Sequence, residues 1–381
     1  MSDLNVLVLS SWYPTEKDPF IGNFVRRHCE AISREVKVWV FHTVEDEKEE
    51  SIRKEVKQSG NLTEVILYLP ESGNPLSKYR GKKKAILAAI EKSKIEFDIL
   101  HAHVLYPMAP LFASVAKRLN IPWVFTEHWS GFHRRFRPKI NPLKWRWIME
   151  RSNTAKMGFP VSENLASSIQ SELPSMTLEL VPNVVKDEFF ERSVSDKDAL
   201  DSTIRFLHVS TLDEKYKNIS GTLEAFAKLK ESGEGFSFTI VTDGDSTFAN
   251  HRVVELGLED EVDFKGPMQP AEIADEMVKA DALVLFSNTE NQPCVILESL
   301  AMGLPVIASS VGDIPNLVTD GKGILVSPGD TDQLRGAFIS FIDNKDFYTN
   351  DSVSIGIAER FSYSAVAKAY VAHYRNVLKQ V

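Results

Sequence analysis

The feature that most constrains the fold is a repeated alternation between short apolar segments and amphipathic ones. Residues 5–10 and 36–41 are continuous apolar runs of strand length, whereas residues 21–33 and 78–95 carry apolar side chains at helical spacing. Strands that alternate with helices favour parallel sheets built from right-handed βαβ units. The sequence therefore predicts an α/β protein with parallel sheets.

The alternation runs through the chain twice, which predicts two Rossmann-like domains. In the first half the predicted strands are 5–10, 36–41, 64–69, 98–103, 122–127, 158–162 and 178–182, and the predicted helices are 21–33, 78–95, 107–119, 142–155 and 163–171. In the second half the predicted strands are 204–210, 236–241, 262–266, 282–287, 305–309 and 323–327, and the predicted helices are 219–231, 247–256, 270–279, 294–302 and 330–342.

Chain length agrees with two domains, because 381 residues suit two cores of roughly 150–200 residues each. The polar, acidic segment at 184–203 has no sustained apolar period and is typical of a connection. We expect domains at 1–185 and 204–362, a linker at 186–203 and a terminal helix at 363–381. That helix has an apolar stripe at helical spacing and must pack against another element.

Composition excludes several classes of protein. Hydrophobic residues make up 43% and charged residues 25%, as in globular rather than disordered chains. No apolar run approaches the roughly 18–20 residues that a membrane span needs, and the first residues lack the features of a signal peptide. The two cysteines, Cys29 and Cys294, form no CxxC motif, so neither a disulfide framework nor a zinc site is expected. We expect a cytoplasmic protein.

The charge is unevenly distributed. Residues 1–185 contain 26 Lys and Arg against 21 Asp and Glu, a balance of +5, and residues 186–381 contain 18 against 32, a balance of −14. The two balances sum to the net charge of −9. Such a split indicates either that the first half meets an anionic partner or that surface charge has drifted by chance.

Ligands of doubly wound sheets bind at the carboxyl ends of the strands, so two such domains that face each other would bind them in a cleft. Neither the dinucleotide motif GxGxxG nor the P-loop motif is present. The candidate loops are 10–24, which contains Gly22 and Asn23, then 241–247, and 287–303.

The third loop carries two carboxylates. Glu290 follows a predicted buried strand, and Glu298 lies within a helix that Pro293 opens. A carboxylate at the end of a strand accepts hydrogen bonds from sugar hydroxyls, and a second one binds a ribose diol while amides between them hold phosphate. The alternative is a solvated loop glutamate and a helix glutamate on a wet face.

The stretch ADALVLFSNTENQPCVILESLAMGLPVIASSVGDIPNLV at 280–318 resembles the retaining nucleotide-sugar glycosyltransferases of family 4, including their Glu-x7-Glu motif. Further segments match this family in the same order along the chain. In the first half they are 97–110, 122–132, 158–165 and 180–190, and in the second half 206–226, 238–246 and 321–330. The resemblance implies a GT-B fold: two Rossmann-like domains that face each other across a cleft, with a carboxyl-terminal helix that returns to the amino-terminal domain. The amino-terminal domain would bind the acceptor and the carboxyl-terminal domain the nucleotide sugar.

The resemblance also implies residue roles. Glu290 would bind hydroxyls of the donor sugar, Glu298 the ribose and Lys217 the donor phosphate. His128 would contact the sugar from the amino-terminal domain, and Gly22, with Asn23 beside it, would let the first loop approach the diphosphate. The other implied donor contacts are Lys215, Thr242, Gly244, Asn291, Cys294 and Val295. His101 and His103 lie at the end of a predicted strand. Each either reaches the cleft or has a structural role through its hydrogen bonds.

The sequence departs from the family pattern around the donor. Ser210 and Thr211 replace the usual Gly-Arg, and Lys215 is the expected substitute for that arginine. Thr242 replaces a glycine, Asn291 and Gln292 replace Gly-Phe, and Asn316 replaces a glutamate. These departures leave the identity of the nucleotide open.

The expected reaction is transfer of a sugar from a nucleoside-diphosphate sugar to a glycan or lipid-linked acceptor, which the resemblance associates with cell-surface polysaccharide or lipopolysaccharide assembly. Lysine charge stabilises the departing diphosphate, so neither a metal nor a cofactor is expected. Asp243-Gly-Asp245 is interpreted as turn chemistry. The alternatives are a nucleotide-sugar epimerase on the same fold and a non-catalytic nucleotide-sugar sensor.

Two segments of the first half, 78–84 and 134–151, concentrate Lys and Arg, and the second also contains Phe136, Trp145 and Trp147. Lysine and arginine beside interfacial tryptophans suit a helix on an anionic leaflet, here the inner face of the cytoplasmic membrane. The alternative is a solvated basic helix whose tryptophans lie in the core. Nucleic-acid binding is not expected, because no recognised motif accompanies the charge.

Overall fold

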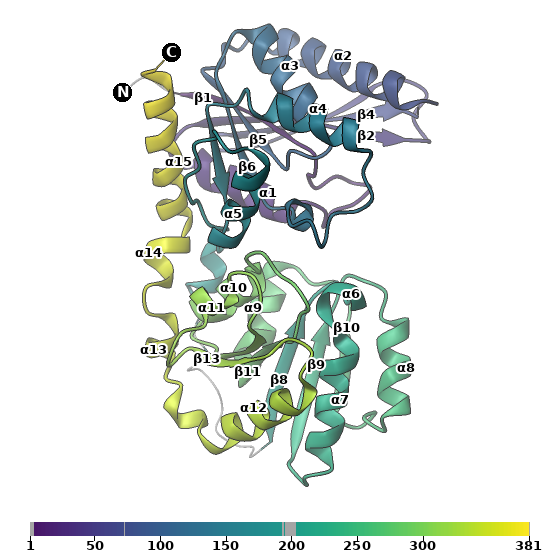
Figure 1. Cartoon of the computed structure of the whole chain (residues 1–381), viewed down its shortest axis with the longest axis vertical. Coiled ribbons are helices and arrows are strands. Elements are labelled where there is room, and N and C mark those ends of the chain that lie inside the picture. The colour runs from purple at the N-terminus through teal and green to yellow at the C-terminus, as the bar shows by residue number, and fades with distance from the viewer. Residues whose placement is uncertain (1–3, 72, 193, 195–202, 381) are drawn as a thin grey trace. The chain divides into compact units, whose positions relative to one another are not determined.

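The computed structural model describes residues 4–71, 73–192, 194 and 203–380 (Figure 1). The chain divides into two compact units, the first made of Met1–Val184 with Tyr363–Val381 and the second of Val185–Ser362. The predicted α/β class is confirmed in both units, because each consists of one mainly parallel sheet with helices on its faces.

The first unit has a seven-stranded sheet in the order β3-β4-β2-β1-β5-β6-β7. Its strands are β1 (Asn5–Ser10), β2 (Lys37–Asp46), β3 (Arg53–Ser59), β4 (Leu62–Pro70), β5 (Ile99–His103), β6 (Trp123–Glu127) and β7 (Met157–Pro160). Its helices are α1 (Asn23–Ser33), α2 (Pro75–Ser93), α3 (Ala109–Leu119), α4 (Pro142–Ser152), α5 (Glu163–Glu172) and α15 (Tyr363–Leu378), with a 3₁₀ turn η1 (Ser130–Phe132).

Two predictions about this sheet were wrong. The segment 178–182 forms no strand, since only Leu178 bridges Gly158. Strand β3 was not predicted, because its sequence RKEVKQS lies mostly exposed at the antiparallel edge and has no apolar run. A charged edge strand of this kind resists pairing with other chains.

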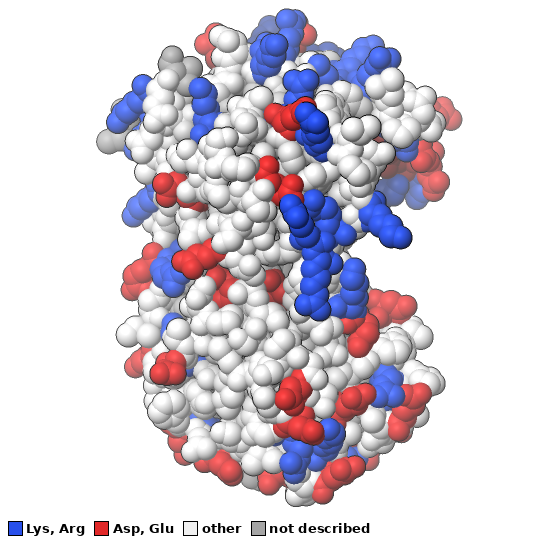
Figure 2. All heavy atoms as spheres, viewed as in Figure 1, with Lys and Arg blue, Asp and Glu red and all other residues white. Residues whose placement is uncertain are grey.

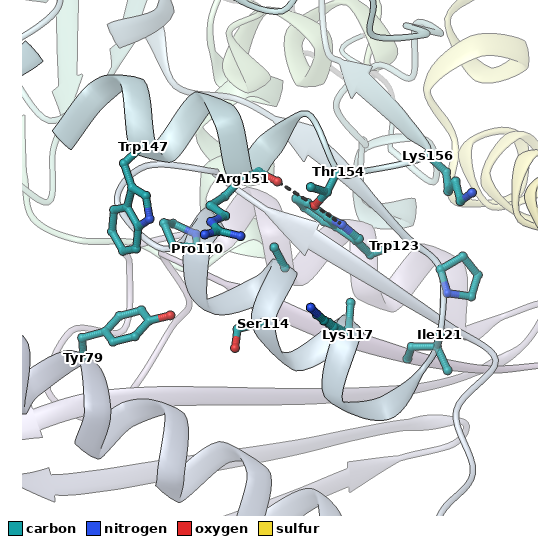
Figure 3. Close-up of a pocket in the computed structure, with 13 residues that line it drawn as sticks. Tyr79, Pro110, Ser114, Lys117, Ile121, Trp123, Trp147, Arg151, Thr154 and Lys156 are labelled. Atoms are coloured by element: carbon teal, nitrogen blue, oxygen red, sulfur yellow. Dashed lines mark hydrogen bonds between the residues drawn. The ribbon is translucent and has the colours of Figure 1, made fainter. Parts of the chain in front are cut away.

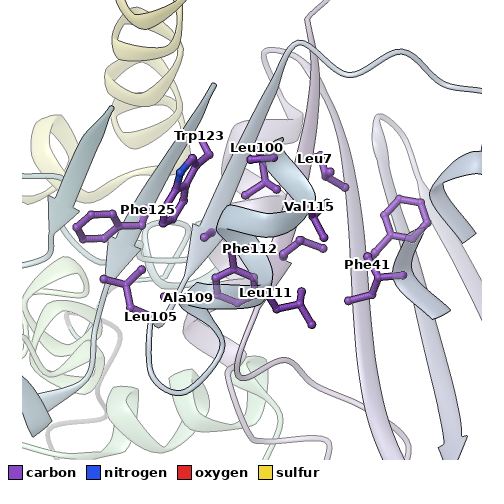
Figure 4. Close-up of a cluster of buried hydrophobic side chains, with 14 of the residues drawn as sticks. Leu7, Phe41, Leu100, Leu105, Ala109, Leu111, Phe112, Val115, Trp123 and Phe125 are labelled. Carbon is purple, nitrogen blue, oxygen red and sulfur yellow. The ribbon is translucent and has the colours of Figure 1, made fainter. Parts of the chain in front are cut away.

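The two faces of this sheet are covered differently. Figure 4 shows one face of this sheet with α3 against it, where Phe41, Phe112 and Phe125 lie in a buried cluster that also includes residues of α2 and α4. On the other face α1 and α15 pack together, and Tyr370 and Tyr374 of α15 are fully buried there. The predicted return of the carboxyl-terminal helix to the first unit is confirmed.

The second unit has a six-stranded parallel sheet in the order β10-β9-β8-β11-β12-β13. Its strands are β8 (Ile204–Val209), β9 (Phe236–Val241), β10 (Val262–Lys265), β11 (Ala282–Leu285), β12 (Val306–Ser309) and β13 (Gly323–Val326). Its helices are α6 (Glu214–Lys217), α7 (Ile219–Lys230), α8 (Thr247–Glu255), α9 (Pro270–Lys279), α10 (Cys294–Ala301), α11 (Ile314–Leu317), α12 (Thr331–Asp343), α13 (Asn350–Ser354) and α14 (Ile357–Phe361), with 3₁₀ turns η2 (Asp187–Phe189) and η4 (Lys345–Phe347).

The segment expected as a linker, 186–203, lies partly outside the described residues, at 193 and 195–202. Its described part packs on the second unit: Phe189 and Val194 belong to the core of that unit, and the Val185 amide donates to the carbonyl of Phe361 at 2.9 Å. Phe189 and Val194 therefore hold the described part of this polar segment against the second unit.

Candidate active site

The second unit brings the predicted lysine and first glutamate together where the strand order reverses, between β8 and β11. Lys217 ends the short helix α6 after β8, and Glu290 follows β11. The Nζ atom of Lys217 lies 2.5 Å from Oε1 of Glu290, and the two side chains are 20% and 11% exposed. Residues 73 positions apart thus form a half-buried ion pair at the carboxyl edge of the sheet.

The loops that carry this pair are joined through their backbones. The amide of Asn288 donates to the carbonyl of Tyr216 at 2.8 Å, and the Asn288 side chain donates to the carbonyl of Lys215 at 3.2 Å. The positions of Lys217 and Glu290 therefore depend on these contacts of Asn288 and not only on their own ion pair.

Glu290 has one carboxylate oxygen that the protein uses and one that it leaves for other donors. Oε1 accepts hydrogen bonds from Lys217 and, at 2.8 Å, from the hydroxyl of Ser287. Among the described residues, no hydrogen bond to Oε2 is found. An oriented carboxylate with a spare oxygen is suited to accept a bond from a hydroxyl.

A second loop, after β12, packs against the backbone of the Glu290 loop. Gly312 has φ +59°, and a Cβ there would lie 2.0 Å from the carbonyl oxygen of Glu290. The amide of Asp313 donates to the carbonyl of Asn291 at 2.9 Å. Only glycine allows this approach, because any side chain would displace the Glu290 backbone.

Two of the departures from the family pattern meet at the buried carboxylate of Asp313. Gln292 Nε2 donates to its Oδ2 at 2.8 Å, and Asn316 Nδ2 donates to its Oδ1 at 2.9 Å. The side-chain amides at 292 and 316 therefore both donate to the one buried carboxylate of Asp313.

Helix α10 starts beside Glu290, with Pro293 as its N-cap and Cys294 and Val295 half-buried in its first turn. The amides of a first helical turn present partial positive charge to an anion. Glu298, the second motif glutamate, lies further along α10 and is only 3% exposed.

The loop after β9 contains Thr242 and Gly244, which were both predicted to contact the donor. The Gly244 amide donates to Thr242 Oγ1 at 2.9 Å, and a Cβ at Gly244 would lie 1.9 Å from the carbonyl oxygen of Thr211. Asp245 accepts the amide of Thr247 at 2.9 Å, as turn chemistry requires. This loop is packed tightly onto the loop after β8.

Lys215 is exposed, and its Nζ lies 3.4 Å from the hydroxyl of Tyr216. No contact with Glu290 is found for it in the described part of the chain. The structure therefore gives Lys217, and not Lys215, the position beside the carboxylate.

In the first unit, Gly22 caps α1 with φ +70°, and Asn23 is the first residue of that helix. Gly22 is buried, and a Cβ there would lie 2.6 Å from the carbonyl carbon of Trp12. The requirement for glycine thus comes from the chain's own backbone. Its predicted approach to a diphosphate stays a prediction.

His128 follows β6 and joins a cluster of buried histidines. Its Nδ1 lies 3.1 Å from Asn183 Oδ1, its Nε2 lies 3.3 Å from His103 Nδ1, and its ring stacks on that of His103. Both ring nitrogens of His128 therefore have partners in the first unit. Its predicted contact with a sugar stays a prediction.

The histidine cluster extends to the carboxyl-terminal helix. The hydroxyl of Tyr374 lies 2.6 Å from His101 Nδ1, and that of Tyr370 lies 3.0 Å from His28 Nδ1. Burial lowers the pKa of His28 to about 4 and holds the pKa values of His101, His103 and His128 well below the usual range. These histidines are neutral near pH 7, and the pattern supports the structural interpretation of His101 and His103.

Sequence reasoning missed Ser287, Gly312 and Asp313, which orient or support the Glu290 loop, and Asn183, which fixes His128. Ser287, Gly312 and Asp313 follow strands, as many structural residues do, and Asn183 follows a segment that forms no strand. No specific sequence signal therefore marks any of the four.

No three His, Cys, Asp or Glu side chains of the described ranges gather as a metal site would require. Within the same described ranges, no helix has both the length and the apolar character of a membrane span.

Comparison with known proteins defines the class. Over 99% of this chain and 100% of the other, the fold matches sucrose-phosphate synthase from Thermosynechococcus elongatus with a TM-score of 0.79 at 19% identity. Two parallel-sheet α/β units of this kind define the GT-B fold of glycosyltransferases.

The family follows from sequence matches. The model for Glycosyltransferase Family 4 matches residues 21–189, and the model for Glycosyl transferases group 1 matches residues 203–344. N-acetyl-alpha-D-glucosaminyl L-malate synthase of Bacillus anthracis is 26% identical over 74% of this chain and 75% of its own length. Phosphatidyl-myo-inositol mannosyltransferase of Mycobacterium leprae is 26% identical over 74% of each chain. This chain belongs to the family 4 glycosyltransferases, enzymes that build glycans and glycolipids; the epimerase and sensor alternatives are not favoured.

Proposed function

We propose that the protein transfers a sugar from a nucleoside-diphosphate sugar to a hydroxyl of a glycan or lipid-linked acceptor, with retention at the anomeric carbon. The observation that carries this proposal is the orientation of Glu290 by Lys217 and Ser287, with Oε2 left to accept from a sugar hydroxyl.

The donor is proposed to bind the second unit. Glu290 binds the donor sugar, the first turn of α10 with Cys294 and Val295 faces the diphosphate, and Glu298 binds the ribose. The further donor contacts are Lys215, Thr242, Gly244 and Asn291, and the first unit supplies Gly22, Asn23 and His128. Before the donor binds, the ammonium of Lys217 uses one N–H group to donate to Glu290. Its remaining N–H groups can donate to phosphate oxygens of the donor.

In the proposed reaction the bond from the anomeric carbon to the phosphate oxygen breaks, and a bond to the acceptor oxygen forms on the same face. The acceptor proton passes to the departing phosphate. Negative charge grows on that phosphate, and the ammonium of Lys217 with the amides of α10 stabilises it. This arrangement supplies positive charge without a metal, so we propose that the reaction needs none.

The acceptor is proposed to bind the first unit, at the surface of an anionic membrane leaflet inside the cell. Positive charge on this unit supports the membrane contact, and the Mycobacterium leprae relative, by its name, acts on a lipid. The structure divides the two tryptophans of α4: Trp145 is buried, whereas Trp147 is 40% exposed and available to a membrane.

Donor hydrolysis tests the proposal. Purified protein is incubated without acceptor with UDP-, GDP-, ADP- and dTDP-sugars, and the released sugar is measured. We expect slow hydrolysis of one nucleotide class, lowered about 100-fold or more by Glu290→Gln and by Lys217→Met. Because the proposed reaction needs no metal, we expect the same rate of donor hydrolysis when EDTA is added.

The matched control is Lys228→Met, which removes a lysine of the same unit that forms an equally short ion pair, 2.5 Å, with Asp332. It should hydrolyse donor at the wild-type rate. Equal losses for Lys217→Met and Lys228→Met, or full activity of Glu290→Gln, would overturn the proposed site.

A further inference from the structure

The first unit contains a cavity that is separate from the proposed site. It has a volume of about 470 Å³ and lies between α2, α3, α4 and the starts of β6 and β7 (Figure 3). Trp123, which begins β6, lines it, whereas His128 follows the carboxyl end of the same strand. The cavity thus reaches the opposite end of the sheet from the residues proposed for glycosyl transfer.

Hydrogen-bond donors from three helices surround this cavity. Figure 3 shows Tyr79 of α2, Ser114 and Lys117 of α3, and Trp147 and Arg151 of α4 around one space. In the described part of the chain, no hydrogen bond or ion pair of these five side chains is found, and no carboxylate lines the cavity. A guanidinium, an ammonium and hydroxyls without an acid nearby are the groups that bind a phosphate.

The surrounding sequence is strongly basic. Residues 101–156 contain ten Lys and Arg against two acidic residues, Glu127 and Glu150, and Glu127 is fully buried. On the face of the first unit that Figure 2 presents, in the upper half, blue Lys and Arg side chains predominate. An anion near this surface is therefore attracted before it reaches the cavity.

Exposed apolar side chains lie on two of the helices that line the cavity, α2 and α4. The rings of Tyr79 and Trp147 meet edge to face at 6.1 Å, which joins α2 to α4. One turn before them are Leu76 and Leu143, which are 57% and 77% exposed, and Trp147 itself is 40% exposed. Leucines and a tryptophan next to basic groups suit insertion into the interface of a bilayer.

We propose that this cavity binds the phosphate of an anionic membrane phospholipid, with Lys117 and Arg151 as its charged ligands and Tyr79 and Ser114 as further donors. Leu76, Leu143 and Trp147 then enter the interfacial layer around the bound lipid. The proposal rests on the membrane contact proposed above and gives that contact a specific binding site. The lipid is an anchor here and not the sugar acceptor.

Vesicle flotation of the full chain tests this site. The vesicles are phosphatidylcholine alone or phosphatidylcholine with phosphatidylglycerol. The site variant is Lys117→Gln/Arg151→Gln, and its matched control is Arg118→Gln/Arg146→Gln, which removes the same charge from exposed residues of the same two helices that do not line the cavity. Thermal melting checks that both variants fold.

We expect wild type to float with the anionic vesicles only, and the site variant to bind them at least tenfold more weakly than the control variant. Diffuse attraction alone is worth about 1 kcal/mol for each basic residue and would weaken both variants equally. Equal weakening would therefore overturn the site while leaving the membrane contact in place.

Calorimetry separates the lipid from free phosphate. Soluble dihexanoyl phosphatidylglycerol should bind wild type saturably and the site variant at least tenfold more weakly. Inorganic phosphate that binds as tightly as the short lipid would overturn the lipid assignment. Failure of wild type to float on anionic vesicles would overturn the membrane contact and this site together, whereas donor hydrolysis tests the transferase independently.

Discussion

The two units each place a glutamate at the end of a buried strand, and they use it in opposite ways. Glu127 at the end of β6 is fully buried and accepts three backbone amides, from Leu105, His128 and Trp129, at 2.9 Å each. Glu290 after β11 accepts from two side chains and keeps an oxygen unused by the described residues. This difference supports the proposal that Glu290 binds the donor, whereas Glu127 holds the backbone around it.

The electrostatic settings of the two strand ends differ as well. Around Glu127 the first unit collects neutral histidines, and burial raises the pKa of Glu127 itself to about 7. Around Glu290 the second unit places the ammonium of Lys217. The first strand end is stabilised by neutral hydrogen bonds, and the second by opposite charges.

The largest expected effect is the response of the first unit to acid. Burial lowers the pKa of His28 and of His42 from 6.5 to about 4, and the pKa values of His101, His103 and His128 are also lowered. The folded state then binds fewer protons than the unfolded state between pH 6.5 and 4, so stability falls as the pH falls through this window. Fully protonating either His28 or His42 in the folded state costs about 3 kcal/mol.

Two other groups enter this balance. The raised pKa of Glu127 acts in the opposite direction between pH 7 and 4.5, but it is one group against five. Among the described residues of the second unit, burial lowers the pKa of His208 to about 4. The first unit should therefore lose its structure at a higher pH than the second.

Fluorescence distinguishes the two units, because all six tryptophans lie in the first: Trp12, Trp39, Trp123, Trp129, Trp145 and Trp147. In an acid titration we expect tryptophan fluorescence to change at a higher pH than the loss of helical circular dichroism. Coincident transitions would contradict the contrast drawn here.

The next effect concerns the support behind Glu290. Gly312→Ala places a Cβ about where the Glu290 carbonyl oxygen lies, at 2.0 Å, and should cost about 3 kcal/mol or more together with most donor hydrolysis. Gly233→Ala is the control, because Gly233 also has positive φ, +83°, but nothing lies within 4 Å of its Cβ position. That control should cost only about 1–2 kcal/mol from backbone strain. Urea unfolding measures both; similar costs would mean that the Glu290 loop is not held by this contact.

The smallest effect compares the two glutamates directly. Glu127→Gln puts an amide donor among three backbone amides and should cost about 1–3 kcal/mol of stability. Glu290→Gln should leave stability within about 1 kcal/mol while removing donor hydrolysis. Unfolding and hydrolysis are measured on both variants, and the reverse pattern would exchange the roles assigned to the two residues.

Much of the fold follows from the sequence, because buried parallel strands are continuous apolar runs. The predicted strand at 236–241 and the predicted helix at 270–279 have the observed bounds. Strand β3 escaped because its pairing with β4, and not its own composition, makes it a strand. Segment 178–182 has a strand's composition but contributes only one bridge.

The site was less predictable. Resemblance paired Lys217 with Glu290, but nothing in the local sequence distinguishes Thr-Glu-His at 126–128 from Thr-Glu-Asn at 289–291. Only the packed structure reveals which carboxylate is enclosed. For the same reason, the basic segment of α4 could not reveal that Trp145 faces the core and Trp147 the solvent.

The position of α15 has a consequence for biosynthesis. Tyr370 and Tyr374 complete the interior of the first unit, although they are translated after the whole of the second. On the ribosome the contiguous second unit has all its residues available first, while the first unit waits with an open groove for its last helix. An amino-terminal fragment that stops at residue 184 would leave His28 and His101 without their tyrosine partners. The first unit can therefore complete its core only after the second unit has been synthesised.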